Sequence, residues 1–100
     1  MSGRDRFTAV MRIMECAKAA MRCQDMLKAL ESLGFEVRDG GKQGHKVVTH
    51  DGIPGFLSAA FTCGHGRNPE IKPAYVGKIR KLLLCYEAEL LNFLETTDEP

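Results

Sequence analysis

Met26-Leu27-Lys28-Ala29-Leu30-Glu31-Ser32-Leu33-Gly34-Phe35-Glu36-Val37-Arg38 is the stretch in which a change of periodicity decides the fold. Its first half repeats apolar residues at helical spacing, from Met26 through Leu30 to Leu33. Gly34 then suits the left-handed position just beyond a helix end. The last four residues alternate apolar and polar side chains, as a half-buried strand does. The stretch therefore predicts a helix that ends at Gly34 and leads directly into a strand.

The segment before this stretch is also predicted to be helical, because no glycine or proline interrupts residues 4–33. Its apolar pattern changes phase, however. The stripe from Phe7 to Met21 and the stripe from Met26 to Leu33 are displaced by roughly 150° on a helix that turns about 100° per residue. One straight helix cannot bury both stripes in one core. We therefore expect a break near residues 21–24 and an additional N-terminal helix over residues 5–20.

Two more strands are predicted after the first. Asp39-Gly40-Gly41 is a turn signal. The segment from Lys46 to His50 contains three β-branched residues, which favours a second strand. A further turn at residues 51–55 precedes a third strand within residues 56–63, and residues 64–69 are predicted to be a loop.

The C-terminal part predicts one long helix. Pro73 suits the first turn of a helix, and an apolar stripe runs from Tyr75 to Leu94. From about Pro73 to Glu95 this helix would be about 34 Å long at 1.5 Å per residue, which exceeds what a small three-stranded sheet can cover. We expect the N-terminal helix to pack against the overhang.

The predicted elements form one α+β domain over residues 1–100. Without the first helix their order is α-β-β-β-α, which predicts a three-stranded antiparallel sheet with helices on one face. This arrangement resembles the double-stranded-RNA-binding domain (dsRBD) fold, although a fold alone does not establish a function.

Composition narrows the functional classes. A chain of 100 residues, 44% of them hydrophobic, fits a single globular domain. No apolar run approaches the roughly 20 residues of a membrane span, and the N-terminal segment is amphipathic, unlike a signal peptide, so a cytoplasmic location is predicted. In that compartment we expect reduced thiols and no disulfide framework for the four scattered cysteines, Cys16, Cys23, Cys63 and Cys85.

The net charge of +1 conceals a segregation of charge. Residues 37–81 contain eight basic and three acidic residues, whereas residues 82–100 contain five acidic residues and no basic one. This asymmetry indicates a polyanionic partner, but ordinary solvated faces explain it equally well. The same two interpretations apply to the basic residues near the last helix, Lys72, Lys78, Arg80 and Lys81.

His45 is the main catalytic candidate, since it stands between Lys42 and Lys46 at the start of a predicted strand. An imidazole can take and give a proton near neutral pH, and lysines can hold a phosphate beside it. On the residues alone, a surface histidine at a strand end is the better interpretation. His65 fits a loop position and His50 a turn position.

Two other motifs carry little weight. Residues 40–46 lack the spacing of a phosphate-binding loop and do not lead into a helix. Cys63 together with neighbouring histidines lacks the paired spacing of a structural zinc site. No metal or cofactor is therefore predicted.

Three features occur in an order that a known family shares. A helix ends in Leu33-Gly34-Phe35, a Gly44-His45-Lys46 segment begins the second strand, and His65-Gly66 is followed by residues 70–79 with the sequence Glu-Ile-Lys-Pro-Ala-Tyr-Val-Gly-Lys-Ile. On these features the chain resembles, from Arg22 to about Leu84, the HicA family of bacterial toxins, which cleave mRNA and are neutralised by HicB antitoxins. Residues 5–20 and 85–95 would be additions to that core.

The resemblance implies a metal-independent ribonuclease in which His45 is the catalytic group. It also implies an mRNA substrate and a HicB-type antitoxin that covers the same face. The residues expected to contact RNA are Lys42, Gly44, Lys46, Arg67 and Lys72. Gly44 replaces a serine that is usual in the family, and the segment between the second and third strands is longer than usual.

Two alternatives stay open at this point. The chain could be a non-catalytic RNA-binding or protein-interaction module of the same fold. The terminal helices could simply enlarge a small core, or Leu84 and Leu91 could contribute to a homodimer or antitoxin surface.

Overall fold

The computed structural model describes residues 3–16, 21–42, 44–64, 66 and 69–97. Its elements are, in order, α1 (Gly3–Cys16), β1 (Met21–Arg22), α2 (Cys23–Ser32), β2 (Glu36–Asp39), β3 (His45–Thr49), β4 (Ala59–Thr62), β5 (Glu70–Ile71), α3 (Pro73–Cys85) and α4 (Glu87–Thr97). Within these residues, four helices accompany an antiparallel sheet of order β2-β3-β4. The predicted α+β class is confirmed.

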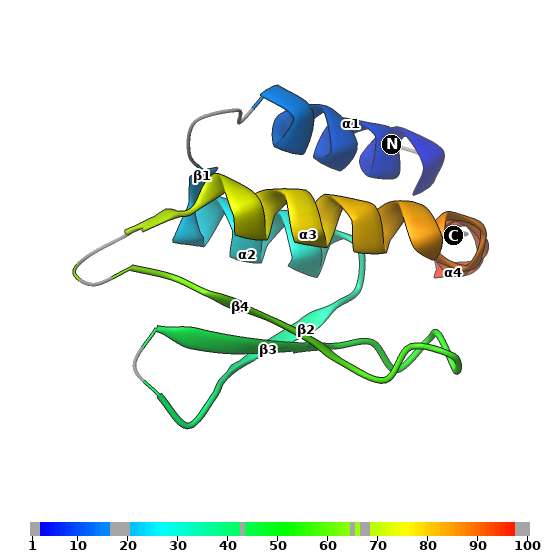
Figure 1. Ribbon diagram of the computed structural model, residues 1–100. Helices are drawn as coiled ribbons and strands as arrows, with labels where there is room; N and C mark the ends of the chain where they lie inside the picture. Colours follow the sequence, from blue (N-terminus) through cyan, green and yellow to red (C-terminus); the bar gives the residue numbers. More distant parts are fainter. Residues whose placement is uncertain (1–2, 17–20, 43, 65, 67–68, 98–100) are drawn as a thin grey trace.

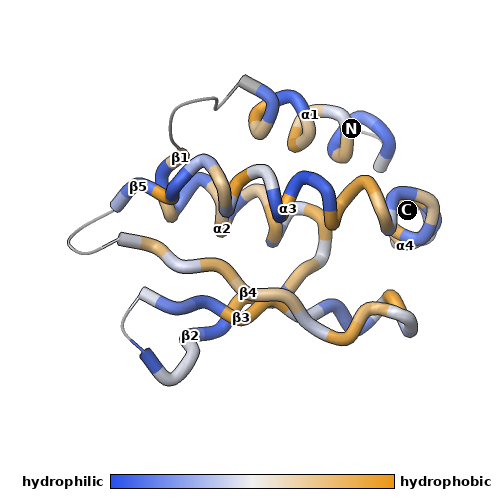
Figure 2. The backbone as a smooth tube through the Cα atoms, viewed as in Figure 1, coloured by the Kyte–Doolittle hydropathy of each residue, from blue (hydrophilic) through white to orange (hydrophobic). Residues whose placement is uncertain are grey.

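The elements form three layers (Figure 1). Helices α2 and α3 cover one face of the sheet, α1 lies over them on the side away from the sheet, and α4 lies across one end. The apolar side of α1 faces α2 and α3 (Figure 2). The core lies between the layers, and its fully buried side chains include Met26, Leu30, Leu33, Val48, Phe61, Ile79 and Leu83. Both faces of the middle helical layer are therefore buried.

The junction between α2 and β2 forms as the sequence predicts. Gly34 has φ of 91°, in the left-handed region. Its N–H donates to the Glu31 carbonyl and the Phe35 N–H donates to the Leu30 carbonyl, at 3.0 and 3.1 Å. This pair of bonds is the Schellman arrangement, which satisfies carbonyls that a helix end otherwise leaves unpaired. The chain leaves the helix in a fixed direction and enters the sheet.

The predicted break between the first two helices is confirmed, because α1 ends at Cys16 and α2 begins at Cys23. The short strand β1 lies directly before α2 and pairs with β5, with Met21 opposite Ile71. This ladder was not predicted from the sequence, since two residues are too few to show a period. It holds the start of α2 beside the start of α3.

The single long C-terminal helix was a wrong prediction. The chain leaves helical geometry at Tyr86, which has φ of −106° and ψ of 20°, and α4 then turns across the end of the molecule (Figure 1). A straight helix would have carried its apolar stripe past the sheet. The turn instead buries Leu90 and Leu94, and the Tyr86 hydroxyl donates to the Gly55 carbonyl at 3.3 Å.

The expectation of reduced cysteines is also wrong for one pair. Cys23 and Cys63 form a disulfide across a sequence separation of 40 residues, with their Cα atoms 5.7 Å apart. The sequence shows no close cysteine pair, and only the packing of α2 against the end of β4 brings the two together. Cys85 is a free, exposed thiol. No helix in the described part of the chain is long and apolar enough to cross a membrane.

Candidate functional site

His45 is positioned by the hairpin that joins β2 to β3. The Gly40 N–H donates to the His45 carbonyl at 2.8 Å, and the His45 N–H donates to the Lys42 carbonyl at 3.1 Å. These two bonds fix the backbone of His45 as the first residue of β3. Lys42 is held within the same turn, and its side chain is exposed.

The His45 side chain lies on the sheet face that α2 and α3 do not cover. Successive strand residues point to opposite faces, and Val48, three positions along, is buried beneath the helices. His45 lies opposite Thr62 of β4. The two line a pocket of about 550 Å³ together with Gly41 and Lys42. His45 and Lys42 therefore line one open pocket at the rim of the sheet.

The orientation of the His45 ring depends on a glycine. A Cβ atom added to Gly40 would lie 2.2 Å from Cδ2 of His45, so the ring rests directly on the Gly40 backbone. The side chain is half-buried. Within the described residues, neither ring nitrogen has a hydrogen-bond partner.

Lys46 lies on the other face of β3. Its ammonium group forms an ion pair with Asp39, the residue opposite it on β2. It also lines a separate small pocket beside the Cys23–Cys63 disulfide. The structure thus separates Lys46 from His45, although the two are adjacent in sequence, and leaves Lys42 as the lysine that shares the His45 pocket.

Gly44 is held where a side chain does not fit. It has φ of 79°, and an added Cβ would lie 2.4 Å from the Cys63 carbonyl oxygen. The Gly44 carbonyl in turn accepts a hydrogen bond of 2.7 Å from the Cys63 N–H. A serine, which is usual at this position in the HicA family, would fit this chain only if the backbone around residue 44 changed. Cys63 therefore links the disulfide to the residue before β3 through a backbone hydrogen bond.

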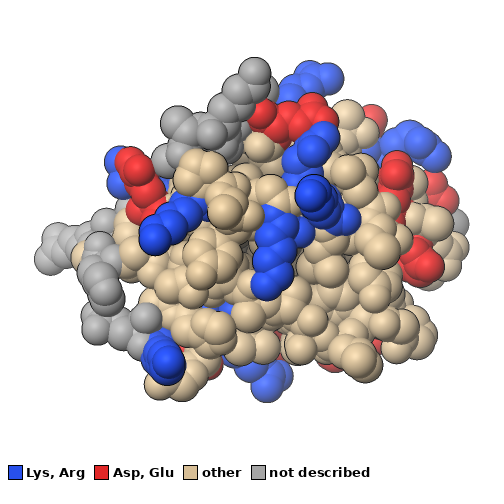
Figure 3. Space-filling view, viewed as in Figure 1, with Lys and Arg blue, Asp and Glu red and all other residues tan. Residues whose placement is uncertain are grey.

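The remaining predicted RNA contacts are not brought to this pocket. Lys72 is exposed and stands at the N-cap of α3, where its carbonyl accepts the Tyr75 N–H at 2.9 Å. It does not line the His45 pocket. Arg67 and His65 lie outside the described residues. Basic side chains gather over α3 on the face shown in Figure 3, and acidic ones gather at the end formed by α4.

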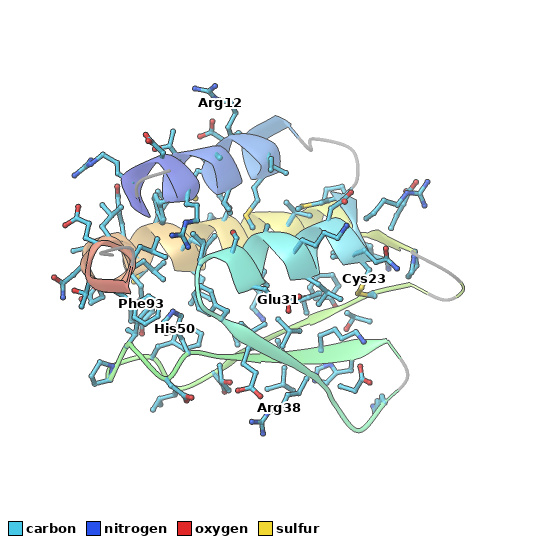
Figure 4. The ribbon with its side chains drawn as sticks, turned by 180° about the vertical axis from the view of Figure 1, so that it is seen from behind. Arg12, Cys23, Glu31, Arg38, His50 and Phe93 are labelled. Atoms are coloured by element: carbon cyan, nitrogen blue, oxygen red, sulfur yellow. A yellow bond between two sulfur atoms is a disulfide. The ribbon has the colours of Figure 1, made fainter. Side chains whose placement is uncertain are left out.

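His50 has a structural position. Its Nε2–H donates to the Leu33 carbonyl and its Nδ1 accepts from the Gly52 N–H, both at 3.0 Å. The ring is buried and meets Phe35 and Phe93 edge-on, at centroid distances of 4.7 and 4.6 Å. Figure 4 shows His50 beside Phe93 of α4. The turn contact agrees with the predicted turn position, but the ring also joins α2 to α4. No signal in the sequence indicated that second role.

No protein-family model, curated protein or solved structure matches this chain. In the described part of the chain, no three His, Cys, Asp or Glu side chains are grouped as metal ligands. The alternative zinc site at Cys63 is ruled out in this structure, since that sulfur is bonded to Cys23.

Proposed function

We propose that this protein is a HicA-like toxin with a dsRBD-like fold, a metal-independent endoribonuclease that cleaves mRNA and is neutralised by a HicB-type antitoxin. The observation that carries the proposal is the pocket in which His45 and Lys42 lie together on the open face of the sheet. Both ring nitrogens of His45 are unoccupied by any described residue. The order of sequence features shared with the HicA family supports the same assignment.

The reaction needs little machinery, because RNA carries its own nucleophile. The 2′-oxygen bonds to phosphorus, the bond from phosphorus to the 5′-oxygen breaks, and a 2′,3′-cyclic phosphate forms. The 2′-OH loses a proton, and the departing 5′-oxygen gains one. His45 would act at one of these proton transfers, as base or as acid, a role typically worth about 100- to 10,000-fold in rate.

Lys42 would offset the charge that develops on the phosphate. It lines the pocket beside His45 and has no acidic partner among the described residues. Lys46 would reach RNA only by breaking its ion pair with Asp39. Lys72 would contact RNA only if the bound RNA extended beyond the pocket to the start of α3. Lys42 is therefore the phosphate contact that the geometry favours.

A second function is supported by the position of Lys46. With that lysine paired on the other face, one cation accompanies the imidazole in the pocket. A non-catalytic RNA-binding or protein-interaction module needs only a surface that binds its partner, and one lysine beside His45 is enough for that. Such a module would bind RNA or a protein without cutting a substrate, so an activity measurement separates the two functions.

The test is single-turnover cleavage of an RNA transcript, with EDTA present, by the parent protein and by His45→Gln. Glutamine keeps a polar side chain but cannot exchange a proton at neutral pH. We expect the variant to be slower by about 100-fold or more, with RNA affinity retained. Lys42→Ala should weaken binding of RNA and slow cleavage.

Lys28→Ala provides the matched control, since Lys28 is an exposed lysine on α2, away from the pocket. It should cleave at the rate of the parent. Equal rates for the parent and His45→Gln would refute the enzymatic assignment. If the parent protein and all variants bind RNA and none of them cleaves it, the protein is the non-catalytic module instead.

A further inference from the structure

The strand β4 forms an edge of the sheet. In the described part of the chain it pairs with β3 alone. The Ala60 carbonyl points away from β3, because it accepts a long hydrogen bond of 3.4 Å from Nζ of Lys78 on α3. An edge of this kind presents backbone N–H and C=O groups that another strand can bond.

An apolar groove runs between this edge and α3. It has a volume of about 290 Å³ and is lined by Ala59, Lys78, Ile79, Lys81, Leu82 and Cys85. The two lysines are three residues apart and so lie on the same side of the helix. Figure 3 shows basic side chains over α3 above a surface without charge. The half-buried Ala59 and Leu82 supply the apolar floor above the fully buried Ile79, and the lysines form its rim.

The two lysines of this groove have no acidic partner among the described residues. Their neighbour Arg80 differs, since it forms an ion pair of 2.8 Å with Glu15 of α1. The groove therefore combines a strand edge that no second described strand pairs with, an apolar floor and two lysines without an acidic partner, one of which contacts the Ala60 carbonyl of that edge.

We propose that the β4 edge and this groove, formed by residues 59–62 and by Lys78, Lys81 and Leu82, are a docking site for an extended acidic segment of a partner protein. The segment would add a strand beside β4. One of its backbone N–H groups would replace Nζ of Lys78 at the Ala60 carbonyl, which frees that ammonium group for a carboxylate of the segment. Every second side chain of a strand faces the same way, so those that face α3 would place an aliphatic residue in the groove between two carboxylates. The predicted pattern is Glu-Xaa-Val-Xaa-Glu.

The charges select this occupant over a second copy of the chain. Pairing β4 with β4 of another copy would bring the same lysines together, and β4 itself contains no acidic residue. An uncharged strand would bury an ammonium group without a partner, which is costly. The groove lining also contains no aromatic ring on which an RNA base could stack. The proposal does not depend on ribonuclease activity at His45.

The experiment measures binding of the fluorescein-labelled peptide Glu-Thr-Val-Thr-Glu to the full chain by fluorescence anisotropy. We expect saturable binding that weakens as salt is added, because the contacts are ionic. The double variant Lys78→Glu, Lys81→Glu should bind this peptide at least about tenfold more weakly. It should instead bind the charge-reversed peptide Lys-Thr-Val-Thr-Lys, which also shows that the variant is folded.

Two controls make the result specific. Lys28→Glu reverses the charge of an exposed lysine on α2 and should leave peptide binding unchanged. An acidic peptide methylated on alternate backbone nitrogens should fail to bind, since it cannot complete a strand ladder. The proposal is overturned if the acidic peptide does not bind up to millimolar concentration, or if the double variant or the methylated peptide binds equally well. It is also overturned if the double variant abolishes self-association or RNA binding and leaves peptide binding intact.

Discussion

At the scale of single residues, Gly44 is the position that most constrains the site. Its left-handed backbone and the 2.4 Å approach of an added Cβ to the Cys63 carbonyl both exclude a side chain. We expect Gly44→Ser to lower the free energy of unfolding by about 1–3 kcal/mol, measured by urea denaturation. A side chain at this position would therefore require the local backbone to rearrange.

Gly41→Ser is the matched control for that measurement. Gly41 lies in the same turn, but an added Cβ would meet nothing within 4 Å. Its unfolding free energy should stay within about 0.5 kcal/mol of the parent. If Gly44→Ser is as stable as Gly41→Ser, the backbone at the start of β3 is not as described.

At the scale of elements, the Cys23–Cys63 disulfide joins the start of α2 to the end of β4. It closes a loop of 40 residues that contains the whole β2-β3-β4 sheet. A cross-link of that span is worth up to about 4 kcal/mol, chiefly through the unfolded chain. We expect Cys63→Ala to unfold at a lower urea concentration than the parent, and the parent in reductant to behave in the same way.

Cys85→Ala is the corresponding control, since Cys85 is exposed and unbonded. It should match the parent in both oxidising and reducing buffer. An unfolding midpoint of the parent that does not respond to reductant would show that the two sulfurs are not bonded in solution.

At the scale of the whole molecule, α4 holds the layers together at one end. Leu94 packs against Gly3 of α1, where an added Cβ would lie 2.5 Å from the Leu94 Cβ, and Phe93 packs against His50. Leu90 is fully buried in the same core. We expect Leu90→Ala to lower the unfolding free energy by about 2–5 kcal/mol.

Leu57→Ala tests whether that loss reflects burial. Leu57 is 87% exposed, so the same substitution there should change stability by less than about 0.5 kcal/mol. Similar losses at the two positions would mean that α4 does not close the core as described.

The sequence was sufficient where the signal is local. The helix–Gly34–strand junction, the break before Cys23 and the three strands follow from periodicity and turn residues. The bend at Tyr86 could not be predicted in this way, because no glycine or proline marks it and the apolar stripe continues through it. The bend arises from tertiary packing, since Leu90 and Leu94 have no core to enter along a straight axis.

The candidate site was predictable in part for the same reason. His45 was found from its neighbours in the chain, and Lys42 joins it in the pocket through the hairpin turn. Lys46 was grouped with His45 by sequence proximity, but strand alternation places it on the opposite face beside Asp39. The disulfide and the buried position of His50 depend on contacts between distant segments, which no local pattern reports.

The most direct test of the central claim is the chemistry of the RNA ends that the parent protein produces in EDTA, determined by mass spectrometry. Proton transfer at His45 during attack by the 2′-oxygen predicts a 2′,3′-cyclic phosphate on one fragment and a 5′-hydroxyl on the other. It also predicts no cleavage where the 2′-hydroxyl is replaced by hydrogen. Fragments that carry a 3′-hydroxyl and a 5′-phosphate would contradict the account.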